Sequence, residues 1–477
     1  GIANADYLRI RGDTRIALGG TYSRADSLLE SERDLQQFAA APELGEVRTL
    51  LPESERFGIN GVLSGHVLKD VSATLNGRVD VSHDDSLLGL GQGRILRRDN
   101  NQTQVHLGTT IGGRLGRWQW TVLGNFDRTE GEVLTDAADT LSRRDSAFST
   151  DTLFNADVLV SGPIATLPAG PLSASLRFGG EFRNFSGRAN VAGTATLAEL
   201  SRDQGGVQAN VGIPIFSRTD KKASPFGNLT LNANVAYDRL SDAGDLWTYG
   251  YGLNWSPAKA IDLVASVTHE EGAPTLEQLG GPTLVTPNLR SFDFVRREVV
   301  DLARVTGGNP GLANDDRRLV RLGTTLRPLA KTDFSISVDY VRSRTDNPIA
   351  RFPILTSQIE TAFPERFARD ATGRLQRIDA RAINFAQARQ QQLRWGINFS
   401  RPLGKVPEFL RDARVKVVTS EAEARRLFPN AEMIRAAPGS ATALGAANLT
   451  SRLYFSLYHN WYLEDDISLR RGGPRLD

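Results

Sequence analysis

The sequence predicts an all-β protein, and three observations favour an antiparallel transmembrane β-barrel. The first is a two-residue alternation of apolar and polar side chains. One phase holds Leu8, Ile10, Ile16, Leu18 and Tyr22, and the same pattern returns at Val71, Ala73, Leu75, Val79 and Val81. Because successive side chains of a strand point to opposite faces, each segment has one apolar and one polar face. Either two sheets bury their apolar faces together, or one sheet closes into a barrel with lipid outside and water inside.

This alternation predicts about fifteen strands along the chain. They cover residues 8–23, 56–69, 71–83, 103–114, 118–128, 152–161, 171–185, 204–214, 228–239, 246–256, 259–270, 317–328, 332–345, 390–401 and 450–463. Most are longer than the usual strand of about 5–6 residues. They are long enough for a tilted strand that crosses a bilayer in about 9–11 residues.

The second observation is that short and long connections alternate. Short ones fall at 69–70, 114–117, 162–170, 257–258 and 329–331, and long ones at 24–55, 84–102, 129–151, 186–203, 271–316 and 346–389. Outer-membrane barrels have short periplasmic turns and long outer loops. Residues 402–449 break the order, and we interpret them as an unusual insertion on the periplasmic side.

The third observation is that all six tryptophans lie in expected strands and on the apolar phase. Aromatic girdles at the two membrane interfaces would place them there. A general preference of tryptophan for strands is the alternative explanation.

Composition excludes several classes of protein. The chain has no cysteine and a formal net charge of +2. It therefore has no disulfide framework or thiolate metal site, and no electrostatic footprint for nucleic acid.

The segment 89–93 is rich in glycine, but a strand follows it where a phosphate-binding loop needs a helix. The five histidines are scattered and no nucleophile elbow occurs, so we expect no metal site, no cofactor and no catalytic residue.

Two short elements flank the long connection 271–316. Ala273, Pro274, Thr275 and Leu276, with Leu279, form the first, and Asn309, Pro310 and Leu312 form the second. In this order they resemble the barrels of TonB-dependent outer-membrane receptors, in which Ala-Pro-Thr-Leu and Asn-Pro-x-Leu elements lead into a strand. Glu271 and Gly272 depart from the aromatic-Arg pair usual there. Because proline fixes φ and removes a backbone donor, we interpret these residues as family markers with a structural role.

The resemblance implies that residues 1–477 are a receptor barrel without the N-terminal plug. An odd count of about fifteen strands cannot close a single-chain bacterial barrel, and barrels of the family have about 22 strands. We therefore also expect the barrel to be incomplete at its C-terminal side.

By the same resemblance, the chain would be a receptor and transporter of the Gram-negative outer membrane. Its outer loops would bind a scarce solute, such as a siderophore, another metal complex or a carbohydrate. A TonB-type energy-transducing protein would drive import through the plug. Further contacts would be outer-membrane lipid and lipopolysaccharide.

The long connections are rich in arginine, which suits an anionic ligand. Candidate ligand-binding residues are Arg290, Arg296, Arg297 and Arg351, and Arg366 and Arg369 lie in the same connections. Solvated loop charge is the alternative explanation for them. Two alternatives to the receptor remain open: a passive porin or substrate-specific channel, and a secreted β-rich adhesin.

Overall fold

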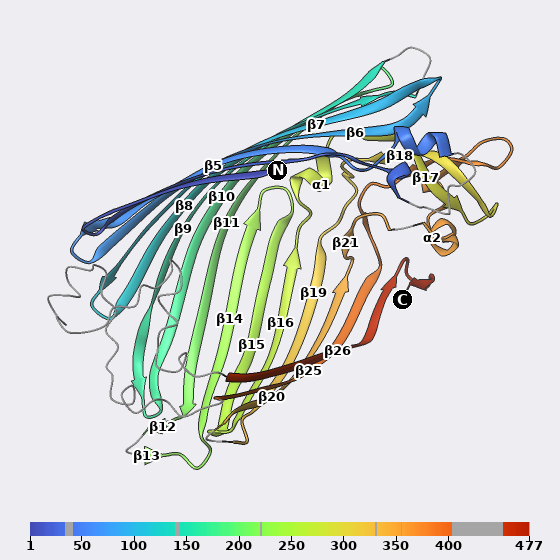
Figure 1. Ribbon diagram of the computed structural model, residues 1–477. Coiled ribbons are helices and arrows are strands. Elements are labelled where there is room, and N and C mark those ends of the chain that lie inside the picture. The colour runs from blue at the N-terminus through green and yellow to red at the C-terminus, as the bar shows by residue number, and fades with distance from the viewer. Residues whose placement is uncertain are drawn as a thin grey trace.

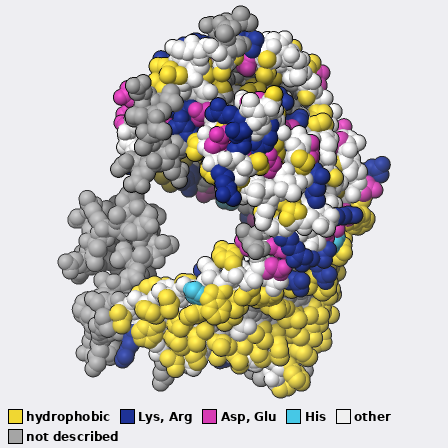
Figure 2. Space-filling view, turned by 90° about the vertical axis from the view of Figure 1, so that its right-hand side faces the viewer, with side chains coloured by type: hydrophobic (Ala, Val, Ile, Leu, Met, Phe, Trp, Pro, Cys, Tyr) yellow, Lys and Arg dark blue, Asp and Glu magenta, His cyan; other side chains and the backbone are white. Residues whose placement is uncertain are grey.

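One large antiparallel sheet dominates the structure, which is a computed structural model. It describes residues 1–33, 42–138, 143–219, 222–329, 332–353, 355–402 and 452–476. The sheet has 17 strands and curves round a hollow (Figures 1 and 2). Its strands are β1 (Ile2–Arg11), β2 (Thr14–Ala25), β5 (Glu53–Leu68), β6 (Val71–Gly91), β7 (Arg94–Leu115), β8 (Trp118–Asp136), β9 (Arg144–Leu167), β10 (Gly170–Val191), β11 (Thr194–Phe216), β14 (Asn228–Leu240), β15 (Gly244–Ala258), β16 (Ile261–Gly272), β19 (Asp315–Leu326), β20 (Asp333–Asp346), β25 (Gln387–Pro402), β26 (Arg452–Ser468) and β27 (Arg475–Leu476). Each pairs with its neighbour in this order.

The alternation sorts side chains between the two faces of the sheet. On β14, Leu231 and Val235 are 38% and 42% exposed on the convex face, whereas Asn232 and Asn234 line a hollow on the concave face. Figure 2 shows a broad hydrophobic field over the lower part of the wall and charged side chains gathered above it. The convex face is thus suited to lipid and the concave face to water.

Residues 8–23, expected as one strand, form a hairpin instead. β1 and β2 meet at a turn in which Gly12 has φ +58°, a conformation that glycine adopts without strain. Because the chain reverses there, Leu8 pairs with Ala17, and Leu18 pairs with Tyr7. Leu8 and Leu18 therefore lie on opposite faces, although their positions in the sequence share one phase.

Three expected long loops are also wrong, since the strands on either side run on into them. β6 and β7 are joined by Gln92 and Gly93, with φ 51° and 79°. β10 and β11 are joined by Ala192 and Gly193, with φ 53° and 80°. A two-residue hairpin turn of type I′ has positive φ at both positions. Most residues of the polar segments 84–102, 129–151 and 186–203 therefore belong to paired strands that extend beyond the apolar belt.

Separate structure occurs where the connections are longest. Between β2 and β5 lie β3 (Leu28–Leu29), η1 (Glu30–Glu32), η3 (Pro42–Val47) and β4 (Thr49–Leu51). Between β16 and β19 lie α1 (Leu276–Gly280), β17 (Leu284–Asp293) and β18 (Glu298–Thr306). Between β20 and β25 lie β21 (Ile349–Ala350), α2 (Ser357–Ala362), η4 (Pro364–Arg366), β22 (Phe367–Arg369), β23 (Leu375–Asp379) and β24 (Ile383–Asn384). The short pair β12 (Arg218–Thr219) and β13 (Lys222–Ala223) lies at the opposite end of the sheet.

The two edges of the sheet stay apart. Within the described ranges, β1 pairs only with β2, and β26 pairs with β25 and, over two residues, with β27. The expected insertion 402–449 lies outside the described residues except for Pro402. The absence of a plug and the incomplete C-terminal side remain predictions. In the described part of the chain, no helix is long and apolar enough to cross a membrane.

Candidate ligand-capture site on the outer loops

The two marker elements, Ala273–Leu279 and Asn309–Leu312, contact each other, and we call the pair the brace. Thr275 caps α1, and its hydroxyl accepts a hydrogen bond from the Gln278 backbone N–H at 3.1 Å. The backbone N–H of Asn309 donates to the carbonyl of Gln278 at 2.7 Å. The Asn309 side chain donates to the carbonyl of Ala382 at 2.9 Å. Asn309 thus joins the first connection to the second.

The brace is anchored to the inner side of the wall. Leu276 is 1% exposed, and α1 packs against β10 and β11. Arg202 donates to the carbonyl of Pro274 at 2.9 Å and pairs with Asp242 at 2.7 Å. Pro310 is exposed at a turn, which the Leu312 N–H closes by donating to the Asn309 carbonyl at 3.3 Å. These contacts support the structural interpretation of the markers, from Ala273 to Leu312.

The connections 273–314 and 347–386 fold into a single unit, which we call the outer unit. Its sheet has the order β17-β18-β23-β22, with β18 and β23 parallel. A core forms beneath it from side chains that are 9% exposed or less: Val300, Leu302, Phe352, Ile359, Ala362, Phe363, Leu375, Ile378, Ala380, Phe385 and Leu469. Figure 1 places this unit above the upper ends of β19, β20 and β25, and β17 contacts β6 of the taller part of the wall.

A buried ion triad locks the two connections together. The Asp293 side chain is 0% exposed, and Arg369 reaches it at 2.6 Å while holding Glu360 at 2.7 Å. Asp293 also accepts backbone hydrogen bonds from Val295 and Arg296 at 3.0 and 3.2 Å. The Arg369 hydrogen bond, above all, lowers the pKa of Asp293 to about 2. The same partners raise the pKa of Arg369.

The four predicted ligand arginines do not converge. Arg290 pairs with Asp301 at 3.1 Å. Arg296 pairs with Glu298 at 2.9 Å and donates to the carbonyl of Thr372 at 2.6 Å. Arg297 lies at the β17–β18 turn with φ 56°, and Arg351 is exposed elsewhere. Arg366 and Arg369 are likewise held by carboxylates. Four of these six arginines are thus paired with carboxylates of the outer unit, and a role in ligand binding remains a prediction.

An apolar cleft of about 330 Å³ opens in the outer unit instead. Its walls include Leu289, Phe292, Phe294, Phe352, Ile378 and Arg304. Phe292 and Phe294 are 43% and 42% exposed, and their rings meet edge to face at 5.0 Å. The sequence interpretation missed these residues because it treated 271–316 as loop. The β-branched run Val299, Val300 and Val305 was a signal for a strand there.

Arg304 is the arginine that lines the cleft. It is half-buried in the cleft wall, and its guanidinium has no carboxylate partner among the described residues. A cation without a partner, beside an apolar cleft, can receive an anionic group whose attached apolar part fills the cleft.

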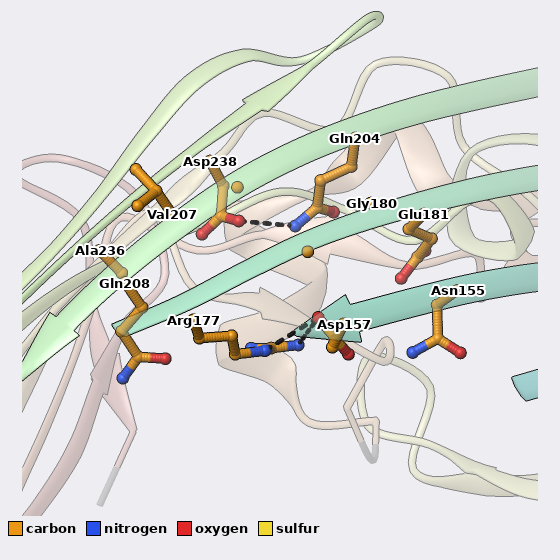
Figure 3. Close-up of a pocket in the computed structure, with 12 residues that line it drawn as sticks. Asn155, Asp157, Arg177, Gly180, Glu181, Gln204, Val207, Gln208, Ala236 and Asp238 are labelled. Atoms are coloured by element: carbon orange, nitrogen blue, oxygen red, sulfur yellow. Dashed lines mark hydrogen bonds and ion pairs between the residues drawn. The ribbon is translucent and has the colours of Figure 1, made fainter. Parts of the chain in front are cut away.

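A second hollow lies on the concave wall and is strongly polar (Figure 3). Asp157, Gly179, Gly206 and Asp238 form one register row across β9, β10, β11 and β14. Arg177 holds Asp157 at 2.9 Å, and Gln204 donates to Asp238 at 3.0 Å. Within the described ranges, no group of three or more His, Asp or Glu side chains is arranged to hold a metal ion.

Three solved structures that share this fold bear the names of receptors or transporters. The siderophore receptor PirA from Pseudomonas aeruginosa matches with a TM-score of 0.54 and 14% identity, over 85% of this chain and 60% of that one. A mutant of the ferric enterobactin receptor PfeA, also from Pseudomonas aeruginosa, matches with a TM-score of 0.56 and 13% identity, over 84% and 57%. The RagAB peptide transporter matches with a TM-score of 0.52 and 9% identity, over 85% and 49%.

This chain therefore spans 60% or less of the length of these receptors. No curated protein sequence matches it. A family profile described as "TonB dependent receptor-like, beta-barrel" matches residues 53–465. The chain belongs to the TonB-dependent receptor-like β-barrel family.

Proposed function

We propose that this chain is the wall and outer-loop part of an outer-membrane receptor that captures a scarce solute and imports it with TonB-coupled energy. The observation that carries the proposal is the outer unit: its own core and ion triad hold an apolar cleft in fixed shape. A preformed site costs less ordering on binding than mobile loops do, which favours tight capture from dilute solution. A freely permeable pore needs no such site.

The cleft also indicates the kind of solute. Phe292, Phe294 and Phe352 would pack on an apolar or aromatic part, and Arg304 would pair with a carboxylate or phenolate. Related structures bear the names of a siderophore receptor, a ferric enterobactin receptor and a peptide transporter, so the family alone does not select one solute. Siderophores and other metal complexes that carry an anionic apolar part fit the cleft better than neutral carbohydrates.

Uptake by whole cells tests the proposal. Radiolabelled siderophores and oligosaccharides would be supplied to cells that express the full-length protein, with and without the energy-transducing protein. We expect saturable uptake that is lost without energy coupling. Uptake that is linear in concentration and independent of coupling would favour the passive channel.

Matched variants link uptake to the cleft. Arg304→Gln should raise the half-saturating concentration about tenfold, the effect of about 1.4 kcal/mol of lost binding energy. Arg377→Gln removes the same charge but should leave uptake unchanged, since Ile378 lines the cleft and the adjacent Arg377 points to the other face of β23. Equal effects of the two variants would contradict capture at the cleft.

A further inference from the structure

A seam joins the outer unit to the tall part of the wall, and it holds more positive than negative charge. In this seam, β17 and β18 contact Arg48 and the outer ends of β6 and β7. Arg48 pairs with Asp301 at 3.1 Å, and Arg290 holds the same carboxylate at 3.1 Å. Arg98 of β7 donates to the Thr286 hydroxyl at 2.8 Å and has no carboxylate partner among the described residues. Three guanidinium groups of the seam therefore stand beside one carboxylate.

Arg48 is buried in the seam with only part of its hydrogen-bonding capacity used. Its side chain is 6% exposed, and Nη2 is the atom that reaches Asp301. Nε and Nη1 are buried and have no hydrogen-bond partner among the described residues. A guanidinium cannot shed its charge as a lysine can, and unmet donors on a buried charged group are costly. Two donors of a buried cation are therefore available to an acceptor.

The backbone around Arg48 fixes the place of this cation. Arg48 forms an antiparallel bridge with Leu88 of β6, and the Thr49 hydroxyl accepts a hydrogen bond from the Leu87 N–H at 3.2 Å. Gly89 has φ +88°, and a Cβ atom there would stand 2.6 Å from Arg48 Nε. The guanidinium thus lies in a notch that only glycine leaves open, so its donors are held in place before any ligand arrives.

Arg98 is a second fixed cation on the same seam. Its Nε donates at 3.0 Å to the hydroxyl of Thr135, a residue that is 2% exposed. Its Nη2 also donates to the carbonyl of Val285 at 3.2 Å. Burial lowers the pKa of Arg98, because these partners are neutral and do not offset the loss of water around the charge. The seam therefore has two guanidinium groups whose positive charge is poorly compensated.

We infer that the seam binds a compact oxyanion of the phosphate or carboxylate type, with Arg48 as its main ligand and Arg98 and Arg290 adding positive charge. Guanidinium groups bind such anions through short, paired, charge-assisted hydrogen bonds, and one oxyanion can accept from more than one donor. Its charge would offset the repulsion among the three cations, so a bound anion would tie the outer unit to the wall. None of these three arginines lines the cleft. The seam is therefore a site apart from solute capture and does not depend on the proposed function.

Hydrogen exchange of the full-length receptor in detergent tests the inference, with inorganic phosphate as the probe. We expect millimolar phosphate to slow exchange in peptides that cover residues 46–51 and 284–290. The slowing should reach about threefold when phosphate is present at about twice its dissociation constant. Peptides from β9–β11 should not respond. Sodium chloride at the same ionic strength should not reproduce the effect, because screening alone supplies no paired acceptor.

Matched variants assign the effect to the seam arginines. Arg48→Gln should raise the phosphate concentration needed for half-maximal protection about tenfold or more, and Arg48→Lys, which keeps the charge without the paired donors, should fall between. Arg98→Gln leaves the Arg48–Asp301 pair in place and should also weaken the response. The control Arg188→Gln removes an exposed arginine that lies over the Phe148 ring of the same tall wall, and it should change the response by less than about twofold.

Acetate in place of phosphate separates the two sources of an oxyanion. Protection by both anions supports a site for either type, and protection by one of them assigns the ligand. Exchange in β9–β11 that matches the wild type verifies that each variant is folded. Absence of protection in the wild type, equal protection by chloride, or a full phosphate response in both glutamine variants would overturn the inference. Because no solute is present, the result is independent of uptake.

Discussion

Asn234 and Val235 are adjacent in the chain and meet different solvents. Asn234 lines the hollow of the concave wall, and Val235 is 42% exposed on the convex face. The two-residue period of a strand alone places these side chains on opposite faces of the sheet. At the residue scale, lipid or water contact is thus decided by the parity of a position within its strand.

This parity predicts unequal effects of one substitution at the two sites. Val235→Arg near the middle of the belt should destabilise the protein folded in a bilayer by about 2–4 kcal/mol. Asn234→Arg should cost less, because water reaches the concave face. Folding yields of the full-length variants in lipid vesicles at increasing urea provide the measurement. Equal losses at both sites would mean that the convex face is not lipid-exposed.

Among the elements, the inner wall is built by carboxylates that lie over glycines of the next strand. A Cβ atom on Gly179 would stand 2.2 Å from Asp157 Oδ1, and one on Gly206 would stand 2.1 Å from Asp238 Oδ1. These glycines leave the space that the hollow in Figure 3 occupies. Gly179 and Gly206 are therefore required because a neighbouring carboxylate occupies the space of a Cβ atom. Their backbone conformation is one that any residue can adopt.

Gly179→Ala should displace the Asp157 carboxylate from its contact with Arg177. The Asp157 side chain is only 7% exposed, so we expect a loss of about 1–3 kcal/mol in folding free energy. The neighbouring Gly180→Ala is the matched control, because a Cβ there would have its nearest atom at an ordinary 3.9 Å. Urea titrations of both variants compare them directly. Similar midpoints would show that the carboxylate moves at no cost.

The same elements show how far sequence reasoning reached. Period-two alternation located nearly every long strand, because it reports burial directly. It could not detect the reversal at Gly12, since apolar residues continue on both sides of the turn. It also ended β6 and β10 too early, because strands beyond the membrane carry polar residues on both faces. The cleft was out of reach, as Phe292 and Arg304 meet Phe352 only through the packing of two distant connections.

On the scale of the whole molecule, the outer unit and the sheet are held by different forces. The sheet is joined along its length by a continuous ladder of backbone hydrogen bonds, which does not titrate, and ion pairs such as Arg177–Asp157 add to it. The outer unit depends on its core and on the Asp293–Arg369–Glu360 triad. Acid should therefore separate the two parts.

The pKa of Asp293 is lowered from 3.8 to about 2 in the folded state. A carboxyl with a depressed pKa stabilises the fold fully above its unfolded value and loses that contribution as pH falls through the folded value. The lost contribution is about 2 kcal/mol, at about 1.4 kcal/mol for each pH unit. We expect hydrogen exchange in β17, β18 and β22 to rise between pH 4 and 2 while β9–β11 stay protected. In Asp293→Asn this rise should shrink, and an unchanged profile would contradict the role of the triad.

The position of Leu469 determines when the outer unit can finish folding. This residue follows β26 along the chain, yet it is 1% exposed within the core of the outer unit. Beside it, the Arg470 guanidinium lies 4.7 Å from the ring centre of Phe363. Contacts across such sequence separations form late, since a long stretch of chain must be ordered first. The outer unit is therefore a late-maturing module: a chain halted before β26 has joined the wall would display an unsealed core, and assembly factors or proteases could distinguish it from the finished receptor.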